Sequence, residues 1–381
     1  MENFLFSSES VGEGHPDKLC DIISDSILDA YLEQDKNSRV AVETFASHGS
    51  IHIAGEITSN AIVNVEKIVR NCLVEIGYTD VAYGLSAEDV AIWISLNKQS
   101  PEIAQGVDEK ENKELGAGDQ GIMFGFACNE TEELMPIPIM FAHKILNLLT
   151  KARKEKVITG LGPDSKSQVC FEYVHGKPNR IDSIVVAQQH TEGKNVEELR
   201  EEIINKILYP LCEEYLDSNT KFFINTTGSF VIGGPKGDTG LTGRKIIVDS
   251  YGGYSRHGGG AFSGKDPTKV DRSAAYMARY MAKNIVAAGL ADKCEVQLSY
   301  SIGLSKPLST FVECFGTNKI SEEKIVQAII ENFDASPKAI IEKFDLKNFK
   351  FKQTASYGHF GRLSFPWEKT DMVGILSKYL E

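Results

Sequence analysis

The run Gly-Gly-Gly-Ala-Phe-Ser-Gly-Lys-Asp at residues 258–266 constrains the fold more than any other stretch of this chain. From Gly259 to Lys265 it has the spacing of a phosphate-binding P-loop, but Asp266 stands where a P-loop has Ser or Thr. A P-loop also opens a helix directly, whereas here the helical pattern begins only at about Asp271. We therefore expect a polyphosphate site, built from glycine N–H groups and a lysine, without the P-loop fold. The alternative is an ordinary glycine-rich surface loop.

The balance of charge limits the classes of partner. The chain has 41 basic and 53 acidic residues, a net charge of −12, which argues against a general binder of nucleic acid or anionic membranes. Seven cysteines without a C-x-x-C pair predict reduced thiols and no cysteine-based metal site. The sequence shows no signal-peptide pattern and no apolar run of membrane-spanning length, so we expect a cytoplasmic enzyme.

Helical and strand patterns alternate along the chain. We expect helices at 16–34, 137–153, 196–212, 273–288, 321–333 and 336–344. We expect strands at 40–46, 51–58, 90–96, 120–128, 168–174, 181–189, 222–226, 246–249, 295–302 and 309–315. Strand pairs separated by single helices predict an α+β protein of repeated sheet-plus-helix units. Similar Gly, Pro, Asp and Lys groups near 14–18, 162–166 and 264–267 are a weak sign of repetition, although turn composition explains them equally well.

Residues 116–121 match the dinucleotide-binding pattern G-x-G-x-x-G. A Rossmann site needs a strand before this pattern and a helix after it. Here a charged run, 108–114, precedes it and a strand pattern follows, so we reject dinucleotide binding. We interpret the segment as a glycine hinge that presents Asp119 and Gln120.

Two aspartates stand at predicted helix starts. Pro16 and Asp17 suit a first helical turn, because proline lacks the N–H that is unsatisfied there and an acidic residue complements the helix dipole. This does not explain His15, and a helix N-terminus also binds anions. Asp17 is therefore either a structural residue or a Mg²⁺ ligand, and Asp271 is either an N-cap or a second ligand.

A second glycine-rich loop spans residues 233–245. It holds five glycines and ends in adjacent Arg244 and Lys245, which offer a planar fork and a compact charge to phosphate. Glu43 and Glu56 lie inside strand patterns, where alternation alone would point both to solvent.

Taken together and in this order, four motifs resemble the methionine adenosyltransferase (S-adenosylmethionine synthetase) family: residues 15–18, residues 116–121, Asp238 with Arg244 and Lys245, and residues 258–266. The resemblance spans almost the whole chain. One departure is Phe126, where many relatives have Tyr.

The resemblance implies three similar α+β domains around a pseudo-threefold axis. It divides the chain at about 1–101, 114–231 and 232–381, with strands exchanged between domains, and makes 97–108 a mobile loop at the active site. It also implies a homodimer with shared active sites, usually paired into a homotetramer.

The implied reaction is attack of the methionine sulfur on C5′ of ATP, with release of tripolyphosphate that is then hydrolysed to pyrophosphate and phosphate. A thioether sulfur is already a nucleophile, so no general base is required. The difficulty is the charge that develops on the leaving polyphosphate, and preorganised cations should therefore dominate catalysis.

The resemblance also implies roles for individual residues. The catalytic groups would be His15, Lys166, Arg244, Lys245, Lys265 and Lys269. ATP would contact His15, Asp164, Lys166, Phe230, Asp238, Arg244, Lys245, Ala261 and Lys265. Methionine would contact Glu56, Gln99, Asp119, Asp238 and Lys269. Two Mg²⁺ ions per site would be bound through Asp17 and Asp271, and K⁺ through Glu43.

Two other functions share some of these features. A simple nucleotide triphosphatase or phosphotransferase needs the same phosphate-binding loops, and methionine-dependent ATP consumption would distinguish it. A non-catalytic nucleotide-binding subunit should have lost some site residues, whereas this chain keeps every motif named above.

Overall fold

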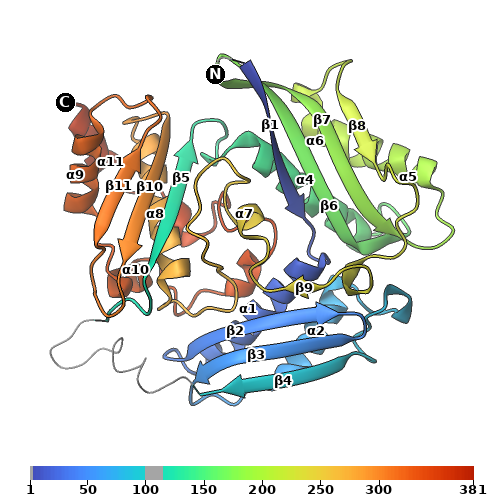
Figure 1. Ribbon diagram of the computed structural model, residues 1–381. Helices are drawn as coiled ribbons and strands as arrows, with labels where there is room; N and C mark the ends of the chain where they lie inside the picture. Colours follow the sequence, from blue (N-terminus) through green and yellow to red (C-terminus); the bar gives the residue numbers. More distant parts are fainter. Residues whose placement is uncertain (1–2, 99–114) are drawn as a thin grey trace.

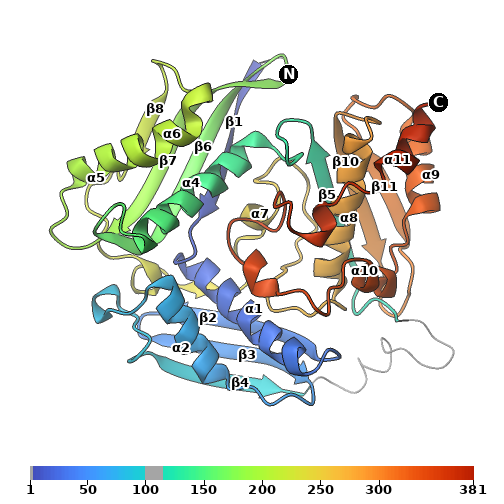
Figure 2. The same ribbon diagram turned by 180° about the vertical axis from the view of Figure 1, so that it is seen from behind.

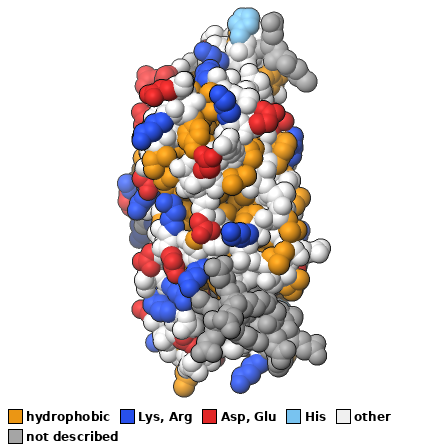
Figure 3. Space-filling model, turned by 90° about the vertical axis from the view of Figure 1, so that its left-hand side faces the viewer, with side chains coloured by type: hydrophobic (Ala, Val, Ile, Leu, Met, Phe, Trp, Pro, Cys, Tyr) orange, Lys and Arg blue, Asp and Glu red, His pale blue; other side chains and the backbone are white. Residues whose placement is uncertain are grey.

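The computed structural model describes residues 3–98 and 115–381, which form three β-sheets around a common centre (Figure 1). The sheets lie toward one side of the molecule and most of the helices toward the other, as the reverse view shows (Figure 2). A view at right angles has a narrow profile, so the molecule is a flattened plate (Figure 3). The predicted α+β class with three sheet-plus-helix units is confirmed.

The first unit is a four-stranded sheet with strand order β4-β3-β2-β9. Its strands are β2 (Arg39–Ser47), β3 (Ser50–Thr58), β4 (Ala91–Asn97) and β9 (Gly240–Leu241). Helices α1 (Pro16–Gln34) and α2 (Val65–Ile76) cover one face of this sheet, the face turned to the viewer in Figure 2. Buried and open side chains alternate along β2, so only one of its faces packs in the core.

The second unit is a sheet with strand order β1-β6-β7-β8. Its strands are β1 (Asn3–Val11), β6 (Leu161–Val174), β7 (Lys177–His190) and β8 (Lys221–Ile224). Its helical segments are α4 (Ile137–Lys154), α5 (Val196–Ile203), a π-helical stretch (Ile204–Leu208) and α6 (Tyr209–Cys212). A separate apolar core lies between this sheet and these helices.

The third unit is a sheet with strand order β11-β10-β5. Its strands are β5 (Gly121–Cys128), β10 (Lys293–Tyr300) and β11 (Ser309–Glu313). The α-helices of this part are α7 (Ile246–Asp249), α8 (Val270–Ala287), α9 (Glu322–Asn332), α10 (Pro337–Lys343) and α11 (Val373–Leu376). Short 3-10 turns across the chain lie at Val81–Tyr83, Glu213–Tyr215, Gly234–Lys236, Phe351–Thr354, Pro366–Glu368 and Ser377–Leu380.

Each sheet contains a strand from a distant part of the chain. β1 pairs with β6, β5 pairs with β10, and β9 pairs with β2. The three units are therefore tied together by backbone hydrogen bonds as well as by side-chain packing. In the described residues, no helix is long and apolar enough to cross a membrane.

Most predicted elements are confirmed in type, including the hairpin of β2 and β3 through Ser47–Ser50. The sequence patterns did not predict β1 or α2. The strand predicted at 246–249 is wrong, because this segment is the helix α7. Three apolar residues followed by an aspartate fit either structure, and the Asp249 N–H closes a helical turn on the Lys245 carbonyl oxygen at 2.8 Å.

The long helix predicted at 196–212 is interrupted by its π-helical stretch. Pro210 lies just beyond it and has no N–H to donate. The wider π turn accommodates the proline without ending the helical path. Helix α8 also begins earlier than predicted, at Val270, with Lys269 as its N-cap.

Carboxylates at four-residue intervals along α1 hold three distant segments of backbone. Asp17 accepts the N–H of Leu241 (3.0 Å), Asp21 that of Gly243 (2.9 Å), Asp25 that of Gly264 (2.8 Å), and Asp29 those of Phe351 (2.7 Å) and Lys352 (3.0 Å). Positions four apart share one side of a helix, so these groups form a continuous row. We call this set the α1 carboxylate row.

Arg272 of α8 neutralises the middle of the α1 carboxylate row. Both of its terminal nitrogens donate to the Asp25 carboxylate at 2.7 Å, and both side chains are fully buried. The same guanidinium donates to the Lys265 carbonyl oxygen at 3.1 Å. This pair therefore links α1, α8 and the loop at 258–266.

We predict that Asp25→Ala lowers the free energy of unfolding by about 3–5 kcal/mol, because it leaves Arg272 enclosed without a counter-ion. Glu66→Ala is the matched control. It removes a 2.9 Å ion pair with Arg70 in which the Glu66 side chain is 56% exposed, and it should change stability by less than about 1 kcal/mol. Urea unfolding at fixed protein concentration measures both. Equal midpoints for the two variants would contradict the prediction.

Candidate active site

Both glycine-rich loops lie along the edge of β2 that is opposite β3, where β9 also pairs. Thr242 donates its N–H to the Thr44 carbonyl oxygen at 3.0 Å. Further along the strand, Val42 donates to Gly264 at 3.0 Å and Asp266 donates to Val40 at 3.0 Å. The loops at 233–245 and 258–266, which are separate in the sequence, are therefore neighbours at one sheet edge.

His15 caps helix α1 and is 2% exposed. Its Nδ1 accepts the N–H of Asp17 at 3.1 Å, so a neutral ring carries its proton on Nε2. Burial, followed by the positive charges of Lys245 and Lys166, lowers the pKa of His15 to about 3. At neutral pH this side chain is thus an uncharged Nε2–H donor.

Cations surround this histidine. Lys245 Nζ donates to Asp17 Oδ2, and Arg244 Nε lies 3.9 Å from Asp17 Oδ1. Burial alone would raise the pKa of Asp17, but the hydrogen bonds from Lys245 and Leu241 outweigh it and lower the value. Lys166 is exposed on β6, where it pairs in register with Val11 at the end of β1.

Asp164 is 5% exposed and only half satisfied. Its Oδ2 accepts the N–H of Gly234 at 2.8 Å, while its Oδ1 is buried without a hydrogen-bond partner among the described residues. Burial raises the pKa of Asp164 to about 6. Gly234 has φ of 59°, and a Cβ there would meet the hydroxyl of Tyr78 at 2.1 Å, so only glycine fits this approach.

Phe230 lies just before the loop at 233–245, and Asp238 lies within it. Two hydrogen bonds with His190 fix the backbone of Phe230: the Phe230 N–H donates to His190 Nε2 at 3.0 Å, and the His190 N–H donates to the Phe230 carbonyl oxygen at 2.9 Å. Asp238 is exposed, and its side chain accepts the N–H of Thr239 at 2.9 Å.

A second group of site residues lies on the other glycine-rich loop. Lys265 Nζ donates to Asp271 Oδ2 at 2.6 Å, and a Cβ on Gly260 would lie 2.5 Å from Asp271 Oδ1. The absence of a side chain at Gly260 therefore lets this loop pass beside the carboxylate. Lys269, the N-cap of α8, binds Asp266. The N-cap alternative for Asp271 is wrong, because Asp271 is already inside the helix.

Glu43 and Glu56 are both exposed, on the face of the sheet turned away from α1. They line one cleft of about 300 Å³ together with Ala261 and Lys265. As strand alternation predicts, both side chains point out of the core. They point toward a cleft that Lys265 also lines.

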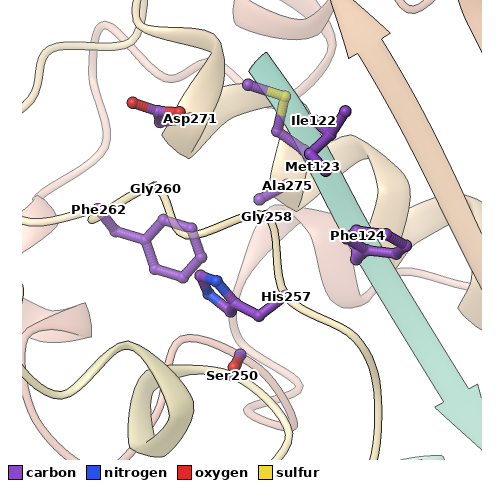
Figure 4. A pocket seen from close by; sticks show the side chains of 10 residues that line it. All are labelled: Ile122, Met123, Phe124, Ser250, His257, Gly258, Gly260, Phe262, Asp271 and Ala275. Carbon is purple, nitrogen blue, oxygen red and sulfur yellow. The ribbon is translucent and has the colours of Figure 1, made fainter.

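A small pocket lies directly behind Asp271 (Figure 4). Its space of about 10 Å³ is close to that of one water molecule. The rings of His257 and Phe262 lie side by side in it, with centroids 6.2 Å apart, and Met123 of β5 lies opposite. His257 Nδ1 accepts the N–H of Gly259 at 2.8 Å and so fixes the glycine turn.

The structure thus gathers the predicted residues into two groups. The first holds His15, Asp17, Asp164, Lys166, Arg244 and Lys245; the second holds Glu43, Glu56, Ala261, Lys265 and Asp271. The groups meet where a Cβ on Gly243 would touch Ala261 Cβ at 2.4 Å. Within residues 3–98 and 115–381, no hydrogen bond or ion pair joins the side chains of one group to those of the other.

Some predicted residues stand apart from both groups. Asp119 is exposed just before β5 and binds the N–H of Gln120 at 2.7 Å. Gln99, and residues 99–108 of the predicted mobile loop, lie outside the described residues.

The sequence analysis did not predict a role for His257, or for Asp21, Asp25 and Asp29 of the α1 carboxylate row. The four-residue spacing of Asp17, Asp21, Asp25 and Asp29 was the available signal.

Comparison with known proteins shows which family the chain belongs to. Models of the N-terminal, central and C-terminal domains of S-adenosylmethionine synthetase match residues 3–101, 114–230 and 232–369. The S-adenosylmethionine synthase of Finegoldia magna is 56% identical over 392 residues, which cover 100% of both chains. That of Treponema denticola is 56% identical over 382 residues, covering 99% of this chain and 98% of its own. The chain therefore belongs to the S-adenosylmethionine synthetase family and is an enzyme of the transferase class.

Proposed function

We propose that this enzyme forms S-adenosylmethionine from ATP and L-methionine. A lone pair of the methionine sulfur forms the bond to C5′ of ATP, while the C5′–oxygen bond breaks and its electron pair leaves with tripolyphosphate. The tripolyphosphate is then hydrolysed to pyrophosphate and phosphate before release. The observation that carries this proposal is the enclosed, neutral Nε2–H of His15 among Lys245, Arg244 and Lys166, in a chain of this family.

A neutral histidine suits the proposed step. The leaving oxygen gains negative charge as the C5′–oxygen bond breaks, and a hydrogen-bond donor already aimed at it stabilises that charge without reorganisation. Because Nδ1 is held by the Asp17 N–H, the ring cannot turn Nε2 away without losing its cap. The neighbouring lysines and arginine offset the remaining charge of the polyphosphate.

The other roles draw on both groups of the site and on residues outside them. We assign the polyphosphate to Lys166, Arg244, Lys245 and Lys265, and the adenosine to Asp164, Phe230 and the backbone at Ala261. We assign methionine to Glu56, Gln99, Asp119, Asp238 and Lys269. The partnerless Oδ1 of Asp164 supports its assignment, because a buried carboxylate oxygen gains from a ligand N–H or O–H.

Asp17 and Asp271 are the proposed Mg²⁺ ligands. Mg²⁺ is usually bound by one or two carboxylates together with substrate phosphates, and it would supply neutralisation of the polyphosphate charge when bound. Asp271 fits readily, because its side chain is 29% exposed and, among the residues that the structure describes, only Lys265 binds it, at Oδ2. Asp17 is 3% exposed with both oxygens engaged, so Lys245 would have to move from its Oδ2. We assign K⁺ to Glu43.

We propose a homodimer with shared active sites, paired into a homotetramer. The outward face of the first sheet carries the row Phe45, His52 and Trp93, whose neighbouring rings lie 5.9 and 6.0 Å apart. Exposed apolar side chains on strands of the other two sheets are Leu5, Phe223, Ile122 and Phe311. A broad sheet face of this kind, open in Figure 1, marks a protein-protein contact. Such a contact would complete a site whose two groups share no direct ion pair.

The domain boundaries and the location also remain proposals. We retain the divisions 1–101, 114–231 and 232–381 along the chain, although strand exchange makes each sheet cross them. We propose that the enzyme works in the cytoplasm.

The direct test is incubation of the protein with ATP, L-methionine and Mg²⁺, followed by mass detection of S-adenosylmethionine. We expect ATP consumption that depends on methionine and yields the sulfonium product with pyrophosphate and phosphate. Equal ATP consumption without methionine would indicate a triphosphatase instead.

We predict that His15→Asn lowers product formation by about 100-fold or more, the scale for loss of one transition-state donor. Asn can still cap α1, so the change removes Nε2–H while keeping the helix start. Binding of a non-hydrolysable ATP analogue should fall far less. His175→Asn is the control, because this histidine is exposed at a turn with φ of 50°, which Asn tolerates. Turnover of His15→Asn within about threefold of wild type would disprove the role.

We predict that Asp271→Asn raises the Mg²⁺ concentration for half-maximal rate by about tenfold or more, since a hard cation loses an anionic ligand. The melting temperature should change little, because Lys269 and not Asp271 is the N-cap and because the Lys265–Asp271 pair is more than a quarter exposed on both sides. Asp17→Asn should shift the Mg²⁺ titration and also lower stability, because it loses the Lys245 ion pair. The surface change Asp292→Asn is the control. Unchanged titrations in both site variants would exclude these ligands.

We predict that Trp93→Glu weakens the dimer, because it places a charge in an apolar contact. Ile330→Glu on α9 is the control, since Ile330 is 65% exposed and Trp93 is 63% exposed. Sedimentation velocity across a dilution series should show dissociation at higher concentration for Trp93→Glu than for the control. Identical dissociation of both variants would place the interface elsewhere.

A further inference from the structure

A cavity of about 350 Å³ lies between α4, Leu211 of α6 and residues 357–362. It belongs to the side of the molecule on which the helices face the viewer in Figure 2. Its volume is within the range of small-molecule sites, about 300–1,000 Å³. Met140, Leu148 and Phe360 contribute apolar walls. None of the residues assigned above to ATP, methionine or a metal lines it.

Arg362 lines this cavity without a counter-ion of its own. Its Nη2 donates to the backbone carbonyl oxygens of Ser356, at 3.2 Å, and Gly358. Its Nε is buried without a partner, and its Nη1 makes no hydrogen bond to a described residue. No carboxylate in the described part of the chain lies within 4.0 Å of this guanidinium. The guanidinium stacks on the ring of Phe365, with its central carbon 4.3 Å from the ring centroid, while Nε has no hydrogen-bond partner among the described residues. A charge mostly removed from water is usually paired with an opposite charge, and within residues 3–98 and 115–381 this one is not.

The nearest carboxylates do not neutralise the positive charge of Arg362. Burial lowers the pKa of Arg362 to about 10, although the charges of Glu368 and Asp249 act to raise it. Glu368 is already bound by Arg279 at 2.8 Å, and Asp249 by Lys18. Arg362 therefore stays positive at neutral pH, while the negative charges near it are engaged elsewhere.

The remaining polar residues of the wall leave a net positive charge. Lys144 and Glu133 neutralise each other at 3.0 Å. His143 is uncharged, because burial and the cations Arg362 and Lys18 lower its pKa to about 3. Its Nδ1 is paired with Ser10 Oγ at 2.8 Å.

The wall formed by the C-terminal segment is tightly fixed. Tyr357 has φ of 60°, which a residue other than glycine adopts only when its surroundings impose it. Its hydroxyl is bonded to Thr150 of α4 at 2.7 Å. A Cβ on Gly358 would lie 2.6 Å from His143 Nε2, and one on Gly361 would lie 2.8 Å from Met140 Sδ. The cavity is thus preformed and needs no rearrangement to accept a ligand.

We propose that this cavity is a binding site for a small organic anion, with its charged group against the Arg362 guanidinium and its apolar body against Met140, Leu148 and Phe360. A guanidinium presents a planar fork that matches the oxygens of a carboxylate or a phosphate. The anion supplies the counter-charge that the protein lacks, and the apolar walls select an anion that carries a hydrophobic group.

The site can be tested by ¹⁹F NMR titration of the full chain with 4-(trifluoromethyl)phenylacetate, the matched benzylphosphonate and the neutral amide of the acid. We expect saturable binding of an acid at one site and at least about tenfold weaker binding of the amide, the scale of one charge-assisted contact. Tighter binding of the carboxylate or of the phosphonate identifies the type of anion. Binding should persist with an excess of a non-hydrolysable ATP analogue, which would displace a probe from the site of the proposed reaction.

Two variants locate the probe. Arg362→Gln should weaken binding of the acids by about tenfold or more and leave binding of the amide unchanged. Arg70→Gln on α2 is the control and should change the affinity for neither probe. Asn147→Trp, at an exposed position of α4 on the cavity rim, should block acids and amide alike while leaving the backbone contacts of Arg362 intact. If Arg362→Gln does not fold, Asn147→Trp still tests whether the probe binds in this cavity. Equal affinity for acid and amide, displacement by the ATP analogue, no saturable binding, or wild-type binding by Asn147→Trp would overturn the proposal.

Discussion

The α1 carboxylate row is the constraint on which the site depends. Loops rich in glycine bury little apolar surface, so packing alone cannot fix their shape. Here Asp17, Asp21 and Asp25 accept backbone N–H groups of Leu241, Gly243 and Gly264, and hydrogen bonds to charged acceptors are stronger than neutral ones. One rigid helix thereby sets the positions of both loops.

A row of buried carboxylates is unstable by itself, because like charges four residues apart repel and burial disfavours each charge. Burial raises the pKa of Asp29 to about 6 and also raises that of Asp21. The compensating cations come from α1 itself, as Lys18, and from segments far along the chain, as Lys245 and Arg272. The charges of the first helix are therefore balanced only where these distant segments pack against it.

The sequence predicted the elements whose conformation follows from a local pattern, and it did not predict those that depend on contacts with distant residues. Strand patterns flanking a probable turn identified β2 and β3, and helical spacing identified α8, because each of these elements buries one face in a core. The segment 246–249 was assigned wrongly because its conformation depends on Asp249, which is buried beside Lys18 of a distant helix. The glycine loops were recognised by composition, but their common docking on β2 is a tertiary contact that no local pattern contains. His257 was missed because its role is to hold the turn at Gly259.

Two ion pairs within the site bear on how the proposed reaction would bind its charged substrate. Lys245 is paired with Asp17, and Lys265 with Asp271, so neither lysine lies in an enclosed site without a counter-ion. On the proposed function, a polyphosphate offers anionic oxygens to the lysines while its Mg²⁺ ions require the two carboxylates. Each ion pair would then be exchanged for two new charge contacts, so neither these two lysines nor these two carboxylates would lose a partner of opposite charge. Each cation must therefore lie beside its carboxylate in the folded chain. The α1 carboxylate row places Asp17 directly, and it positions Lys265 through the hydrogen bond from the Gly264 N–H to Asp25.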